Sequence, residues 1–250
     1  MAAFLLLQFW IKKYVIQIMR NILFLFGFLF TILSFSQSIN QIDKNGERHG
    51  LWKKNYDSTE VARYEGEFFH GKEIGVFKYY KKVDDKAILA ATKQFNKDNN
   101  LSEVSFFSST GKLISKGQMN GKLYVGTWVY YQNKTNYILS KDQYNNDGKL
   151  HGERLVYYEN GELAQKEVYV NGKLHGSSVW YAENGTVIKE YAYDQGELHG
   201  PAKYYNQDGV MVLQGQYQSD RKHGVWKYYE AGKLIREKDF TRRSKNPYKN

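Results

Sequence analysis

The feature that most constrains this chain is a short unit that recurs about every 24 residues. Its opening dipeptide, His-Gly, marks five of these units, and the last four glycines of these dipeptides stand 24 residues apart. Two further units keep a glycine at this place without the histidine. The residues that define the frame are His49, Gly50, Gly75, Gly126, His151, Gly152, His175, Gly176, His199, Gly200, His223 and Gly224. A fixed period of this length predicts an array of small supersecondary units, each of which packs on its neighbours.

Each unit continues with large aromatic residues, in most copies an adjacent pair. These aromatic residues are Trp52, Phe77, Tyr79, Tyr80, Trp128, Tyr130, Tyr131, Tyr157, Tyr158, Trp180, Tyr181, Tyr204, Tyr205, Trp226, Tyr228 and Tyr229. A degenerate copy of the unit at 101–113 has Phe106 and Phe107 in place of the tyrosine pair. Runs rich in Tyr, Val, Phe and Trp, joined by Asn-Gly or Asp-Gly, predict β-hairpins. We expect eight hairpins between about residues 49 and 240. The predicted fold is all-β, an elongated single-layer antiparallel sheet of tandem hairpins.

The repeated elements Asn-Gly-Lys-Leu-His-Gly, Trp-x-Tyr-Tyr and Tyr-x-x-Gly resemble the MORN-repeat variant family, in particular bacterial proteins labelled YwqK-type antitoxins. The resemblance covers roughly three quarters of the chain, because a repeat array is recognised by the recurrence of its unit along the chain and not by a single motif. It implies a repeat protein, and the label implies one that neutralises a toxin by binding it directly. Residues 81–100 depart from the pattern, because their turns are longer and the His-Gly is missing. A site unique to this chain is expected first in that segment.

The N-terminus has the features of a secretory signal. Met19, Arg20 and Asn21 precede an apolar run from Ile22 to Leu33, and small residues follow at 34 and 36. This order predicts a leader at 1–36, with the signal at 19–36 and cleavage between Ser36 and Gln37. The run is short for a membrane-spanning helix, although an uncleaved anchor is the alternative. Export to the periplasm, the cell envelope or the exterior is therefore expected, with a linker at 37–48 before the repeat array at 49–240. Both Met1 and Met19 are compatible with the start.

The net charge of +10 is concentrated at the two ends of the chain. Residues 1–36 hold three basic residues and no acid, and the tail at 241–250 holds four basic residues. The repeat body is thus close to neutral, with a net charge of +3. No specific nucleic-acid binding is expected from it. The basic tail leaves association with anionic lipid open as an alternative.

The repeated histidines are the residues that most suggest a metal-binding site. Successive repeats lie two strands apart, about 10 Å, so the histidines before glycine should be too far apart to share one metal ion. We expect them to be turn residues that pack on the next unit's aromatic ring, and His70 to be a solitary turn histidine. Carboxylates recur with the unit and mark no unique pocket, no nucleophile elbow or phosphate loop is present, and the chain has no cysteine. The sequence predicts no catalytic, cofactor-binding or metal-binding residue, and therefore no enzyme.

The aromatic ladders allow two interpretations. They fill the faces of a thin sheet and bury one another, or they form exposed rows that stack on sugars, peptides or lipid head groups. The first interpretation is favoured because a single-layer sheet has no other core. The expected partner is a protein or an envelope component, with a toxin or anionic lipid as alternatives.

Overall fold

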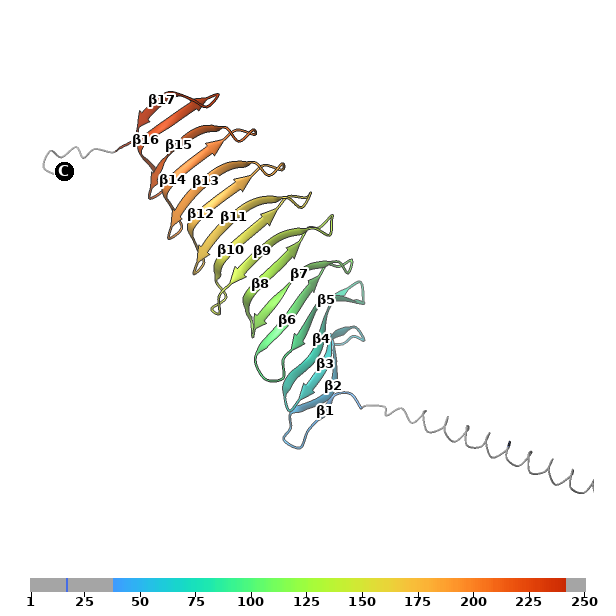
Figure 1. Ribbon diagram of the computed structural model, residues 1–250. Coiled ribbons are helices and arrows are strands. Elements are labelled where there is room, and N and C mark those ends of the chain that lie inside the picture. Colours follow the sequence, from blue (N-terminus) through green and yellow to red (C-terminus); the bar gives the residue numbers. More distant parts are fainter. Residues whose placement is uncertain (1–16, 18–37, 242–250) are drawn as a thin grey trace, which may run out of the picture. The chain divides into compact units, whose positions relative to one another are not determined.

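The computed structural model describes residue 17 and residues 38–241. Its strands are β1 (Gln41–Ile42), β2 (Arg48–Asn55), β3 (Ala62–Phe69), β4 (Lys72–Val83), β5 (Lys86–Phe95), β6 (Leu101–Phe107), β7 (Leu113–Asn120), β8 (Leu123–Tyr131), β9 (Ile138–Tyr144), β10 (Leu150–Tyr157), β11 (Leu163–Val170), β12 (Lys173–Tyr181), β13 (Val187–Asp194), β14 (Glu197–Tyr205), β15 (Met211–Gln218), β16 (Arg221–Glu230) and β17 (Lys233–Asp239). Consecutive strands pair antiparallel, from β1 with β2 to β16 with β17 (Figure 1). After the short β1 they form eight hairpins in one open sheet. This confirms the predicted fold class.

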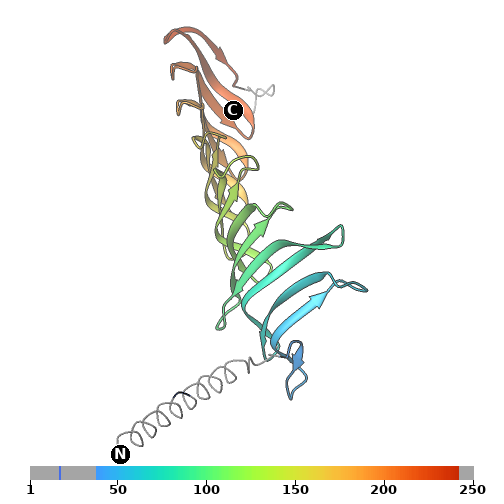
Figure 2. The ribbon, with the colours of Figure 1, turned by 90° about the vertical axis from the view of Figure 1, so that its right-hand side faces the viewer.

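The tight turns follow the expected chemistry. Asn171 and Gly172 both have positive φ angles, 50° and 86°, as do Gln195 and Gly196 at 50° and 94°. Two consecutive residues with positive φ define the two-residue hairpin turn whose twist matches the strands that it joins. Figure 2 shows the hairpins changing direction progressively along the array, as the twist of an open sheet requires.

The His-Gly dipeptides that define the repeat frame do not lie in turns, and here the expectation was wrong. His151 and Gly152 lie inside β10, and the corresponding dipeptides lie inside β2, β12, β14 and β16. Gly152 has φ 100°, and the strand register shifts beside it between Leu150 and Arg154. The register also shifts across Gly176, Gly200 and Gly224. Glycine adopts this backbone without strain, so these four dipeptides form β-bulges that strengthen the local twist. The turns lie a few residues earlier.

The aromatic pair is also displaced by one residue in one repeat. Tyr79 and Tyr80 stand four and five residues after their frame glycine, as do the pairs that begin at Tyr130, Trp180, Tyr204 and Tyr228. In β10 these two places are Val156 and Tyr157, and β10 ends there, so Tyr158 lies beyond the strand. The hydroxyl of Tyr158 donates to the backbone oxygen of Tyr181, 2.6 Å away in the next repeat.

The irregular segment 81–100 is an extended hairpin followed by a loop. The pairing of β4 with β5 continues past Tyr80 to Val83 opposite Lys86. Asp84 and Asp85, with φ 45° and 56°, close it with the same kind of tight turn. The departure from the repeat is therefore extra strand length at one hairpin tip.

Candidate functional site

The two faces of the sheet differ in chemistry. We call the face that carries Trp128 the inner face and the opposite one the outer face. Side chains alternate between faces along a strand, and directly paired residues share a face. One inner row crosses the middle of the strands and contains Phe77, Lys93, Val104, Gly117, Trp128, Asp142, Arg154, Glu167, Ser178, Tyr191, Ala202, Gly215 and Trp226.

Aromatic rings build the core of the inner face. Trp128 and Trp226 are fully buried and Phe77 is 1% exposed. The ring of Trp128 stacks on Tyr124 with centroids 3.9 Å apart, and Trp226 meets Tyr217 edge to face at 5.1 Å. The indole N–H of Trp226 donates to the backbone oxygen of Gln216, 3.1 Å away. The expectation that the aromatic residues bury one another is therefore confirmed for these rings of the inner row.

A glycine lies directly beneath each of these three rings. A Cβ atom added to Gly66 would lie 2.4 Å from Phe77, one on Gly117 2.5 Å from Trp128, and one on Gly215 2.2 Å from Trp226. Where the ring position holds a small residue, the opposite residue is large. Ser178 faces Glu167 and Tyr191, and Tyr191 also faces Ala202. Large and small residues thus alternate so that the thin sheet fills its own face.

A buried charged cluster interrupts the aromatic row. Arg154 pairs with Glu167 (Nη1 to Oε2, 3.0 Å) and with Asp142 (Nε to Oδ1, 3.4 Å). The side chains of Asp142 and Glu167 are 10% and 7% exposed, and Arg154 is 34% exposed. Gln165 and Tyr169 also donate to Glu167. Burial opposes the charge of Arg154, but the two carboxylates outweigh it and raise its pKa. Each carboxylate lies within ion-pair distance of the Arg154 guanidinium, so the cluster has the character of a structural ion-pair network.

Sequence reasoning missed this cluster because its members are spread over β9, β10 and β11. The available signal is that Asp142 lies opposite both Trp128 and Arg154, so a carboxylate stands between an aromatic ring and a cation. Finding it requires the strand register, which the bulges shift.

Buried tyrosine hydroxyls on both faces resist ionisation. Burial, together with the neighbouring charge of Glu73, raises the pKa of Tyr79 to about 12. Burial and a hydrogen bond to Glu65 raise the pKa of Tyr80 to about 12 as well. Burial and the hydroxyl of Tyr191 raise the pKa of Tyr204 to about 12. All three phenols are neutral at physiological pH and act in packing and hydrogen bonding.

The repeated histidines do not converge on one point. His175 Nδ1 lies 3.2 Å from Asp194 Oδ1, and His151 Nδ1 accepts a long hydrogen bond of 3.4 Å from the backbone N–H of Asn171. The ring of His49 contacts that of Phe69 at 5.6 Å, and Phe69 belongs to the same hairpin and not, as expected, to the next unit. His70 is not solitary, since its ring lies 4.8 Å from that of His49 and its Nδ1 lies 2.5 Å from Asp43 Oδ2. The spacing argument compared only successive histidines of the repeat and so overlooked this pair.

The outer face combines ion pairs with exposed apolar side chains. Lys78 pairs with Glu65 at 3.1 Å, and Lys203 pairs with Glu190 at 3.3 Å. Large apolar side chains stand between these pairs. Those placed on the outer face by strand alternation and more than one third exposed are Leu51, Phe69, Val76, Leu101, Leu123 and Val225. They extend from the first hairpin to the last.

Other expectations concern residues that the structure does not describe. The cleavage site between Ser36 and Gln37 falls in the undescribed range 18–37, and all but the first residue of the basic tail falls in 242–250. Within residue 17 and residues 38–241, no helix is long and apolar enough to cross a membrane.

The described part of the chain is thus a tandem β-hairpin repeat protein, with a packed inner face and an exposed outer one. Residues 150–171, 174–195 and 198–219 match the family described as "MORN repeat variant". Each match covers one hairpin, namely β10–β11, β12–β13 and β14–β15, so these three hairpins are MORN-variant repeats.

A comparison with curated proteins finds no match. Among solved structures, the chain is similar to a protein of unknown function from Bacteroides fragilis NCTC 9343, with 10% sequence identity and a TM-score of 0.17. That similarity covers 70% of this chain and 96% of the other.

Proposed function

We propose that this chain is an exported, non-enzymatic repeat protein that binds a protein partner of the cell envelope along the outer face of its sheet. The observation that supports this is the distribution of exposed apolar side chains. Val76 in β4, Leu123 in β8 and Val225 in β16 are 51%, 46% and 47% exposed on that face. Apolar side chains that recur along one exposed face offer area that a protein partner gains from covering.

The inner face is a poorer candidate for binding. Its largest rings, Trp128 and Trp226, are fully buried. Each ring lies directly against a strand glycine, so no space for a ligand remains beneath it. The outer face has charged pairs that fix the register of a partner and apolar side chains that gain from burial. A non-enzymatic role fits the repetition, because the same polar groups return in each unit and do not form one distinctive site.

Site-specific photo-crosslinking in the native host tests the binding face. A photoreactive amino acid placed at Val76, Leu123 or Val225 is expected to capture the same protein at all three positions. Matched controls are Lys54 and Lys238, which are exposed but lie on the inner face because they pair with inner-face residues. Equal capture from Lys54 and Lys238, or a different protein at each outer position, would contradict the proposal.

Export is tested by locating the mature chain. Mass spectrometry of an extracytoplasmic fraction is expected to find Gln37 as the first residue, as the signal cleavage rule predicts. A chain retained in the soluble cytoplasmic fraction with its leader intact would contradict export. It would leave the binding face to be decided by crosslinking.

A further inference from the structure

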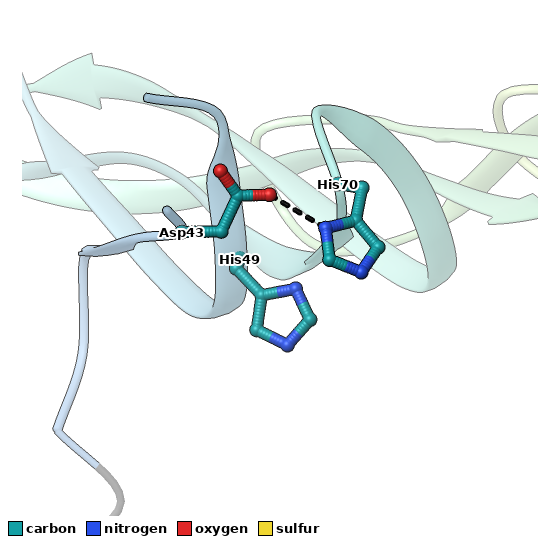
Figure 3. A group of neighbouring side chains, drawn as sticks. All are labelled: Asp43, His49 and His70. Carbon is teal, nitrogen blue, oxygen red and sulfur yellow. Dashed lines mark hydrogen bonds and ion pairs between the residues drawn. The ribbon is translucent and has the colours of Figure 1, made fainter. Parts of the chain in front are cut away.

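Three potential metal ligands gather at the first edge of the sheet, and we call them the N-terminal cluster. Asp43 follows β1, His49 lies in β2, and His70 lies in the turn between β3 and β4. One ligand atom from each of them lies within 4.8 Å of the other two. Figure 3 shows the three side chains turned toward one another, with the Asp43 carboxylate against the ring of His70.

The three ligand atoms lie within 4.8 Å of one another, so none of their separations exceeds what a tetrahedral ion requires by more than about 1.5 Å. A tetrahedral ion with bonds of 2.0–2.1 Å holds its ligand atoms about 3.3 Å apart. In the N-terminal cluster, His70 Nδ1 and Asp43 Oδ2 are 2.5 Å apart and share a proton. An ion that replaces this proton needs this pair to open by less than about 1 Å. The side chain of His70 is 47% exposed and has room to move.

The carboxylate of Asp43 is held ready by its own turn. Its Oδ1 accepts hydrogen bonds from the backbone N–H groups of Asn45 (2.8 Å) and Glu47 (2.9 Å). Oδ2 is thereby directed at His70, and only 7% of the Asp43 side chain is exposed to solvent. Hydrogen bonds that fix a ligating carboxylate in this way are the usual outer support of a metal site.

His49 supplies the second, independent observation. Its Nδ1 is buried, and no hydrogen-bond partner within the described residues reaches it. In Figure 3 the ring nitrogen on the side next to the side-chain attachment faces Asp43 and His70. A buried ring nitrogen without a partner is costly, and coordination of a cation by its lone pair would satisfy it.

The same turn is present again about halfway along the sheet, between β9 and β10, with other side chains. Asn145 Oδ1 accepts from the backbone N–H groups of Asp147 and Lys149, both at 3.0 Å, just as Asp43 does in its turn. Asn145 Nδ2 then donates to Asn171 Oδ1 at 3.0 Å, and His151 Nδ1 is satisfied by the backbone of Asn171. Neutral amides thus take the places of Asp43 and His70. The fold tolerates either set, but only the N-terminal cluster has good metal ligands.

We propose that Asp43, His49 and His70 bind one divalent transition-metal ion of the zinc class. Two imidazoles and one carboxylate are suitable ligands for such an ion, and water completes its coordination. The ion joins the turn after β1 to the turn between β3 and β4. It therefore clamps the first edge of the array. At the Asn145 turn, in contrast, an amide hydrogen bond from Asn145 to Asn171 takes the place of the ion.

Zinc titration of the full chain, carrying an affinity tag without histidine, tests the site. The wild-type chain is expected to bind one equivalent of Zn²⁺ and to unfold at a higher temperature when it is bound. The double variant Asp43→Asn with His70→Asn reproduces the Asn145 turn, so it is expected to fold, and to bind at least tenfold more weakly. Asparagine accepts the positive φ of 46° at position 70.

Two further variants sharpen the result. His175→Gln removes a histidine that has one carboxylate neighbour but no second histidine, and it is expected to leave zinc affinity unchanged. Asn145→Asp with Asn171→His builds the ligand set at the second turn, and a second equivalent of bound Zn²⁺ would support the proposal. Zinc binding by the Asp43→Asn, His70→Asn variant that equals wild type, or no zinc binding by wild type, would overturn it.

Discussion

At the residue scale, the glycines in the inner row are as important as the aromatic rings. Gly66, Gly117 and Gly215 lie in strands, where glycine is normally unfavourable. They are accommodated because each backbone supports a buried ring that any side chain would displace. Burial of such a ring contributes a few kcal/mol, which exceeds the roughly 0.5–1 kcal/mol that a strand glycine costs.

Replacing Gly215 tests this packing. Gly215→Ala is expected to destabilise the protein by about 1–3 kcal/mol, because its Cβ would overlap the Trp226 ring. Trp226→Ala is expected to cost about 3–5 kcal/mol through the cavity that it leaves. Chemical denaturation of both single variants and the double variant measures the coupling.

The double variant is expected to be more stable than the sum of the two losses predicts, because removal of the ring removes the overlap. Additive losses would show that Gly215 matters for a reason other than the ring.

At the scale of elements, the charged cluster joins three strands from two hairpins. Arg154 in β10 links Asp142 in β9 to Glu167 in β11. Exposed ion pairs such as Lys203 with Glu190 contribute little, because water screens them. Removal of one partner from a buried network is different, since it leaves charge without compensation.

The variant Arg154→Met is therefore expected to destabilise the protein by about 2–4 kcal/mol, slightly less than for a fully buried pair because Arg154 is 34% exposed. The matched control is Lys203→Met, which removes a cation from the exposed pair and is expected to cost less than about 1 kcal/mol. Thermal or chemical denaturation of both variants gives the comparison. Equal losses would mean that the Arg154 cluster contributes no more than a surface pair.

At the scale of the whole molecule, stability accumulates along the array because each hairpin contacts only its neighbours. The two edges differ from the middle. The first is covered only by the two residues of β1, and every residue of β17 is exposed. Tyrosines in separate repeats link the stability of the array to alkaline pH.

Alkaline titration tests this link. The folded pKa values of Tyr79, Tyr80 and Tyr204 are raised by burial to about 12, compared with 10 in the unfolded chain. The folded state therefore keeps protons that the unfolded state loses. Their stabilising contribution is complete below pH 10 and is lost as the pH rises from 10 to 12. Phenolate absorbance is expected to show these tyrosines ionising late, together with loss of strand signal in circular dichroism.

The control is the same titration in denaturant, where all tyrosines should ionise near pH 10. Full ionisation near pH 10 in a chain that still has its strand signal would contradict the prediction.

The sequence by itself determined the number and order of the hairpins, because turn residues and aromatic runs are local signals that repeat along the chain. It misplaced the His-Gly dipeptides as turns, since a glycine with positive φ serves a turn and a strand bulge equally well. It also misaligned Tyr157 and Tyr158, because these adjacent tyrosines look like the pair of the other repeats although they stand five and six residues after Gly152.

Only the tertiary structure decided which side chains meet. The bulges shift the register between strands, and a shift of one residue moves a side chain to the other face. The glycines beneath the rings, the partners of Arg154 and the approach of Asp43 to His70 all depend on that register. The period of this sequence thus fixed its architecture, whereas its distinctive sites arose from contacts across strands.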